Sequence, residues 1–126
     1  MEKINLIARI ILGLMMTIFG LNGFFHFIPM PPPKPEVGQY LGALAATGYF
    51  FPLLKGTEVL IGLALLSGRF VPLSLVVLAP ITINIVALHA FLDPAGLPMG
   101  IVVVILQGIL VKATWPAYEG LLKAKA

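Results

Sequence analysis

The sequence of 126 residues contains no cysteine. Without a thiol, the chain cannot form a disulfide, ligate zinc or an iron–sulfur cluster through sulfur, or attach a c-type haem covalently. Any sulfur chemistry in which this protein takes part therefore needs a partner or a non-covalent site.

Charged residues are also scarce: they make up 10% of the chain, whereas hydrophobic residues make up 60%. In ordinary soluble domains, charged residues make up about 25% and hydrophobic residues about 45–50%. A soluble domain of this size could not bury so much apolar surface, and a disordered chain would be far more polar. The eight Lys and Arg residues are scattered and give a net charge of only +3, which argues against nucleic acid as a partner. The composition predicts an integral membrane protein, whose first partner is the lipid bilayer.

Four apolar runs approach the roughly 20 helical residues needed to cross a bilayer. They cover about residues 4–27, 49–67, 70–92 and 97–113. Backbone groups in lipid must be paired internally, so each run should be a helix. The first run is longer than a signal-peptide core and has no A-x-A cleavage site, so we expect it to be retained. The predicted fold class is all-α: a polytopic membrane protein with one domain, residues 1–126, built as an antiparallel bundle of four transmembrane helices.

The positions of the basic residues predict the orientation of these spans. One side of the membrane would carry most of them: Lys3, Arg9, Arg69, Lys112, Lys123 and Lys125. The other side would carry Lys34, with Lys55 inside the second span. Because basic residues favour the cytoplasmic side, we expect both termini to be cytoplasmic.

The link between the first two spans has two parts. Residues 29–35 are rich in proline, which makes a stiff spacer or a docking motif for a partner. Val37, Tyr40, Leu41 and Leu44 then follow the spacing of one helical face. We therefore expect an outer proline-rich loop and amphipathic helix over residues 29–47, with the helix lying in the membrane interface.

Six polar residues are expected to share a layer in the outer half of the bilayer. They come from three spans and are Asn22, His26, Lys55, Glu58, Asn84 and His89. Intramembrane ionisable residues are candidates for function because their burial is costly. Each also has a structural interpretation. Lys55 and Glu58 can pair at i, i+3, the histidines can anchor the helix ends, and Asn84 can bond a carbonyl freed by Pro80.

The functional hypothesis is a small polar pocket that opens outward. Glu58 is the candidate proton relay, and His26 and His89 are candidate hydrogen-bond donors to a quinone-like carbonyl or an anion. Quinone is thus the candidate cofactor. Two lone histidines are weak grounds for a non-covalent haem, and the spacing of the residues predicts no metal site.

The chain resembles the DoxX family of small bacterial and archaeal membrane proteins over nearly its whole length. The resemblance rests on ARIILGL at 8–14, FGLNGFFHF at 19–27, PLLKGTE at 52–58, APITIN at 79–84 and HAFLDP at 89–94, with an HFIPMP segment after the first helix. It implies a four-helix protein of a prokaryotic inner membrane. The family takes its name from a thiosulfate:quinone oxidoreductase, some members are linked to redox-stress systems, and a distant group includes eukaryotic cargo receptors.

Three function classes follow. The leading one is a quinone-associated redox component, or the membrane anchor of a redox complex, that is not an enzyme on its own and works with a membrane or soluble redox partner. The second is a transporter of a small solute or protons, which would need a homo-oligomer because four short helices make a poor carrier. The third is a non-catalytic interaction protein.

Overall fold

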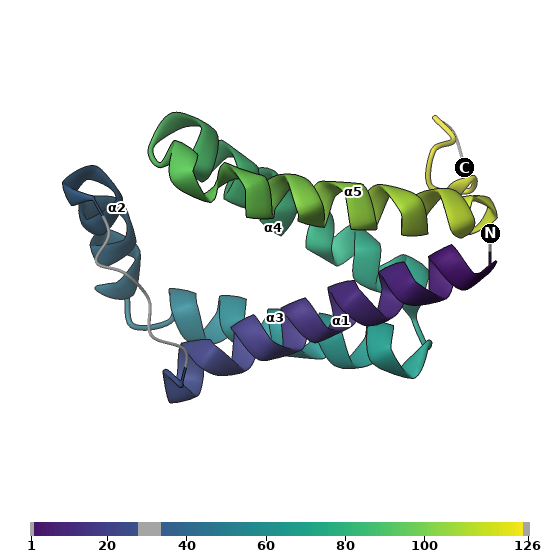
Figure 1. The fold of residues 1–126 in the computed structure, drawn as a ribbon, viewed down its shortest axis with the longest axis horizontal. Coiled ribbons are helices and arrows are strands. Elements are labelled where there is room, and N and C mark those ends of the chain that lie inside the picture. Colours follow the sequence, from purple (N-terminus) through teal and green to yellow (C-terminus); the bar gives the residue numbers. More distant parts are fainter. Residues whose placement is uncertain (1, 28–33, 125–126) are drawn as a thin grey trace.

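The computed structural model describes residues 2–27 and 34–124, and the regular secondary structure in them is all helical. The helices are α1 (Glu2–Phe25), α2 (Pro35–Ala45), α3 (Phe50–Ser67), α4 (Val71–Phe91), η1 (Pro94–Gly96), α5 (Leu97–Ala113) and η2 (Trp115–Tyr118) (Figure 1). Of the predicted proline-rich stretch at 29–35, residues 29–33 lie outside the described residues, and Pro35 is the first residue of α2.

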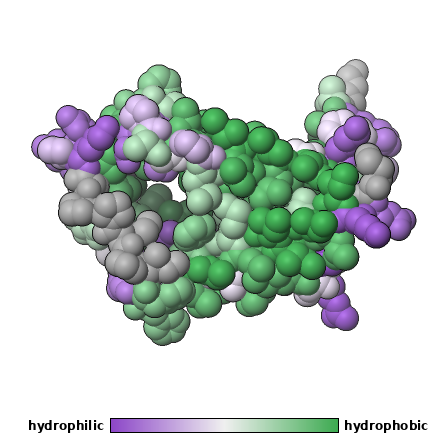
Figure 2. All heavy atoms as spheres, in the orientation of Figure 1, coloured by the Kyte–Doolittle hydropathy of each residue, from purple (hydrophilic) through white to green (hydrophobic). Residues whose placement is uncertain are grey.

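Four of these helices are long and apolar enough to cross a membrane. They cover Glu2–Phe25, Phe50–Ser67, Val71–Phe91 and Pro94–Ala113, which confirms the four predicted spans to within a few residues. Figure 2 shows the corresponding surface, a hydrophobic middle with hydrophilic residues gathered toward the two ends. Large side chains such as Leu60, Leu73, Ile83 and Ile105 are exposed along the helices, as a lipid-facing surface requires.

The helices are arranged as two pairs, α1 with α3 and α4 with α5 (Figure 1). The pairs meet near the end that carries both termini and diverge toward the end that carries α2. Leu12, Leu65, Leu75, Leu78 and Leu110 are almost completely buried in the core that joins them. The two helix pairs therefore pack together at the end that carries the termini and are separated at the end that carries α2.

Glycines let α1 and α3 approach closely. A Cβ added to Gly20 would lie 2.9 Å from the carbonyl oxygen of Lys55, and one added to Gly62 would lie 2.8 Å from the carbonyl oxygen of Gly13 and would overlap Thr17. Small residues permit such backbone contact between membrane helices. These glycines therefore serve packing within the chain.

Polar groups fasten the terminal end. The Arg9 guanidinium on α1 donates to the carbonyl of Leu65 at 2.7 Å and to that of Leu66 at 3.3 Å. Carbonyls in the last turn of a helix lack intrahelical partners, so this arginine caps α3. The Tyr118 hydroxyl of η2 donates to the Pro72 carbonyl at 3.1 Å, which ties the segment after α5 to the start of α4.

Substituting Gly62 with alanine should destabilise the fold by roughly 1–3 kcal/mol, because the new methyl group overlaps Thr17. Gly56→Ala is the matched control on the same helix, since its Cβ would meet nothing within 4 Å. Thermal unfolding in detergent, followed by circular dichroism, should show a lower Tm for Gly62→Ala alone. Equal Tm values for the two variants would contradict tight glycine packing.

Candidate functional site

A cavity of about 380 Å³ lies between α2, α3 and α4, at the end where the helix pairs diverge. The space-filling view shows a hollow at this end (Figure 2). Aliphatic side chains from all three helices form much of the wall. The aromatic and polar lining residues are Tyr40, Phe50, Phe51, Lys55, Glu58 and Asn84. Three of the six predicted site residues, Lys55, Glu58 and Asn84, thus meet at one pocket.

Lys55 and Glu58 form the predicted i, i+3 ion pair. Lys55 Nζ lies 3.2 Å from Glu58 Oε2, and the two side chains are 26% and 5% exposed. The approach is close in distance but is not aligned as a hydrogen bond, so Oε2 is a buried oxygen that makes no hydrogen bond within the described part of the chain. The pocket therefore has a buried carboxylate in its wall that is balanced by one lysine.

The stem of Lys55 lies against α1. A Cβ added to Gly23 would overlap the Cγ of Lys55, so only glycine leaves room for this side chain in its present course. This link between Gly23 and the site was not predicted from the sequence. The sequence shows that Gly23 follows Asn22, but it does not show which side chain Gly23 contacts. That contact depends on how α1 is rotated about its axis against α3.

The Asn84 amide Nδ2 donates to the backbone carbonyl of Pro80 at 2.9 Å. The expectation that it would bond a carbonyl freed by Pro80 was therefore wrong. The carbonyl that loses its helical donor belongs to Val76, four residues before the proline. Val76 lies eight residues from Asn84, or about 12 Å along the helix, beyond the reach of an asparagine side chain.

The other three predicted site residues are not among the described lining of the pocket. Asn22 is buried in α1 and engaged in an interaction. His26 is exposed and follows α1 with a left-handed backbone (φ 52°), its backbone N–H donating to the Asn22 carbonyl at 2.8 Å. This conformation is uncommon for a residue with a Cβ, and it ends the helix. The six residues therefore do not all meet at the pocket.

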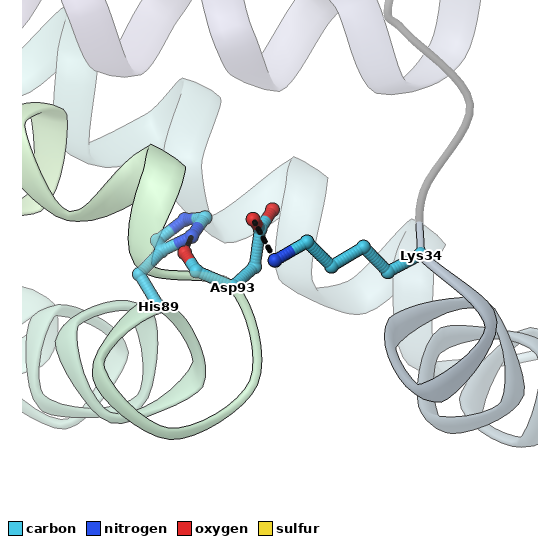
Figure 3. Close-up of polar contacts among 3 residues, drawn as sticks. All are labelled: Lys34, His89 and Asp93. Atoms are coloured by element: carbon cyan, nitrogen blue, oxygen red, sulfur yellow. Dashed lines mark hydrogen bonds and ion pairs between the residues drawn. The ribbon is translucent and has the colours of Figure 1, made fainter.

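His89 belongs to a second polar cluster, shown in Figure 3. Its Nδ1 lies 3.3 Å from the carbonyl oxygen of Asp93, and its ring packs so closely on Gly96 that a Cβ there would overlap it. The Asp93 carboxylate lies 3.8 Å from Lys34 Nζ. Because Lys34 immediately precedes α2, this ion pair links the start of α2 to the turn after α4. The sequence alone did not predict that Lys34 and Asp93 pair.

A third polar group joins α4 to α5 and was also missed as a unit. Thr82 Oγ1 donates to Gln107 Oε1 at 2.7 Å, and Gln107 Nε2 donates to the Leu75 carbonyl at 3.0 Å. Both side chains are buried. Within residues 2–27 and 34–124, no group of three or more His, Asp or Glu side chains lies close enough together to hold a metal ion.

Comparison of the chain with protein-family models, with curated proteins and with solved structures found no match in any of the three.

Replacing Lys55 with methionine should destabilise the protein by about 3 kcal/mol, because it leaves the Glu58 carboxylate buried without its cation. The double variant Lys55→Met/Glu58→Met should recover much of this loss, since it removes both charges and keeps apolar volume. Lys123→Met, an exposed lysine, is the control. Chemical unfolding in mixed micelles gives the free energy of unfolding of the wild type, the Lys55→Met and Glu58→Met variants and the double variant, which together form a double-mutant cycle. Full additivity of the two substitutions would show that the pair is not coupled.

Asp93→Asn should loosen α2 at its start by removing the partner of Lys34. An exposed ion pair contributes at most about 1 kcal/mol, so backbone hydrogen exchange over Pro35–Ala45 should speed up by no more than about fivefold. Glu36→Gln is the control, because Glu36 is exposed on the same helix and makes no ion pair within the described residues. Unchanged exchange in Asp93→Asn would mean that this pair does not hold α2.

Proposed function

We propose that this chain is a DoxX-like protein of a prokaryotic inner membrane that binds a quinone in the pocket between α2, α3 and α4. In this role it is a quinone-associated component, or the membrane anchor, of a redox complex. The observation that carries the proposal is the chemistry of the pocket: apolar and aromatic side chains line it together with the buried Glu58, the partly buried Lys55 and the exposed Asn84.

The pocket suits a flat apolar ring that carries carbonyl groups. Its volume of about 380 Å³ falls within the 300–1,000 Å³ typical of small-molecule sites. Tyr40, Phe50 and Phe51 offer aromatic surface to the ring, while the Lys55 ammonium and the Asn84 amide are hydrogen-bond donors. Quinone carbonyls accept hydrogen bonds but cannot donate them, so a donor-bearing apolar pocket matches them.

The proposed membrane arrangement is an antiparallel bundle with the pocket at its outer end. The described basic residues Lys3, Arg9, Lys112 and Lys123 belong to segments at the terminal end, which the positive-inside rule assigns to the cytoplasm. In this orientation α2 lies in the outer interface. Its Val37 is buried, its Glu36 and Gln39 are exposed, and its Tyr40 and Leu44 line the pocket.

The chain supplies binding and a proton-accepting group, and a partner supplies the electrons. With no cysteine, the chain has no thiol to oxidise. Glu58 lies in the pocket wall, where its carboxylate can accept a proton from a bound quinol or return one to a quinone. The protein therefore acts with a redox partner rather than as an enzyme on its own.

Binding of a short-chain quinone to the detergent-purified protein, measured by titration calorimetry, tests this function. Asn84→Leu should weaken binding about fivefold by removing one hydrogen-bond donor, and Leu44→Trp should abolish it by filling the pocket. His26→Ala is the control, because His26 is exposed and outside the described pocket lining.

Absent binding to the wild type, or equal binding by all variants, would reject the quinone site. Proton flux through liposomes that depends on Glu58 but not on quinone would instead support the transporter class. Loss of binding in Leu44→Trp alone, with Asn84→Leu unchanged, would show an apolar ligand site in which the asparagine takes no part, contrary to the proposal.

A further inference from the structure

A second cavity, of about 460 Å³, lies along α4 and α5 on a different face of α4 from the quinone pocket. From α4 it is lined by Ala79 and Thr82, and from α5 and η2 by Gln107, Gly108, Lys112 and Trp115 among others. We call this cavity the α4–α5 groove. It shares no described lining residue with the quinone pocket, so an inference about it stands apart from the proposed function.

The length of the groove and the residues at its base suit a lipid acyl chain. Its α5 wall runs from Val104 to Lys112, one residue before the helix ends at Ala113, a rise of about 12 Å. One leaflet of a bilayer core is about 15 Å deep. A Cβ added to Gly108 would meet nothing within 4 Å, so the space above this glycine is open. The side-chain polar groups of Thr82 and Gln107 are bonded to each other and to the Leu75 carbonyl, which leaves a floor compatible with hydrocarbon.

The end of the groove nearest the termini carries a cation and an aromatic ring. Lys112 is the one charged residue in its described lining, is exposed, and makes no ion pair within residues 2–27 and 34–124. Trp115 lies just beyond it, 46% exposed and in edge contact with Tyr118. Tryptophan favours the level of the lipid headgroups, and lysine attracts anionic headgroups there.

We propose that the α4–α5 groove is a binding site for one anionic phospholipid. Its acyl chain lies over Gly108, and its phosphate contacts Lys112 beside the Trp115 ring. Two features of the groove favour this lipid. The length of its apolar wall is close to the depth of one leaflet, and Lys112, which makes no ion pair within the described residues, lies at the level expected for headgroups. A second copy of this chain packed groove to groove would leave Lys112 without an anionic partner, because the rest of the described groove lining is uncharged.

Trp115 makes the site measurable, because it is the one tryptophan in the sequence. The full chain is placed in nanodiscs of phosphatidylcholine, and its fluorescence is quenched by brominated phosphatidylglycerol or by brominated phosphatidylcholine at equal mole fraction. We expect the anionic lipid to quench at about fivefold lower mole fraction. Lys112→Gln should remove this preference, whereas Lys112→Arg should retain it.

Two further variants separate the acyl chain from the headgroup. Gly108→Leu fills open space and should reduce quenching by both lipids, while Lys123→Gln, which removes a cation outside the groove lining, should change nothing. Free inorganic phosphate should not compete, because it lacks the acyl chain. The proposal would be overturned if the two lipids quenched equally, or if the preference survived in Lys112→Gln. Competition by phosphate alone would also overturn it. So would a dimer in native mass spectrometry whose interface shields Trp115 from quenching.

Discussion

The close approach of α1 and α3 is the constraint on which the rest of the structure depends. Gly13, Gly20 and Gly62 bring the two backbones together, and Gly23 continues the same contact outward to the Lys55 side chain. Once this pair is fixed, Arg9 reaches the last carbonyls of α3 at one end. At the other end the stem of Lys55 is held on α1 while its ammonium meets Glu58. The candidate site is therefore supported by a helix that contributes no residue to its described lining.

Polar groups inside an apolar bundle must find partners, and this chain solves the problem in two contrasting ways. Between α4 and α5, Thr82 and Gln107 bond each other and a backbone carbonyl, so they serve as a structural fastening. Beside the pocket between α2, α3 and α4, the Glu58 oxygen that lies 3.2 Å from Lys55 Nζ makes no hydrogen bond within the described residues. The Thr82–Gln107 group thus stabilises packing through hydrogen bonds, whereas the Glu58 carboxylate in the pocket wall is balanced by the Lys55 ion pair.

The two ends of the molecule differ in how they are closed. At the terminal end, buried leucines, the Arg9 cap and the Tyr118 hydroxyl join all four long helices. At the other end, α2 contributes to the pocket wall and is joined to the turn after α4 by the Lys34–Asp93 pair, in which Lys34 is exposed and Asp93 partly exposed. Exposed pairs contribute little free energy. The contact between α2 and the turn after α4 is therefore weaker than the packing at the terminal end.

The sequence by itself determined the features that depend on neighbouring residues. Four apolar runs of sufficient length required four spanning helices, and a spacing of three residues placed Lys55 and Glu58 on one helical face. Only the tertiary structure decided which polar residues meet. Shared depth suggested that Asn22, His26 and His89 would join the pocket, but depth does not fix the direction in which a helix face points. That direction is set by the rotation of each helix in its packing, and for His26 by a left-handed backbone that ends α1. The same packing brought Lys34 to Asp93 and Thr82 to Gln107, pairs too distant in the chain for any local pattern to reveal.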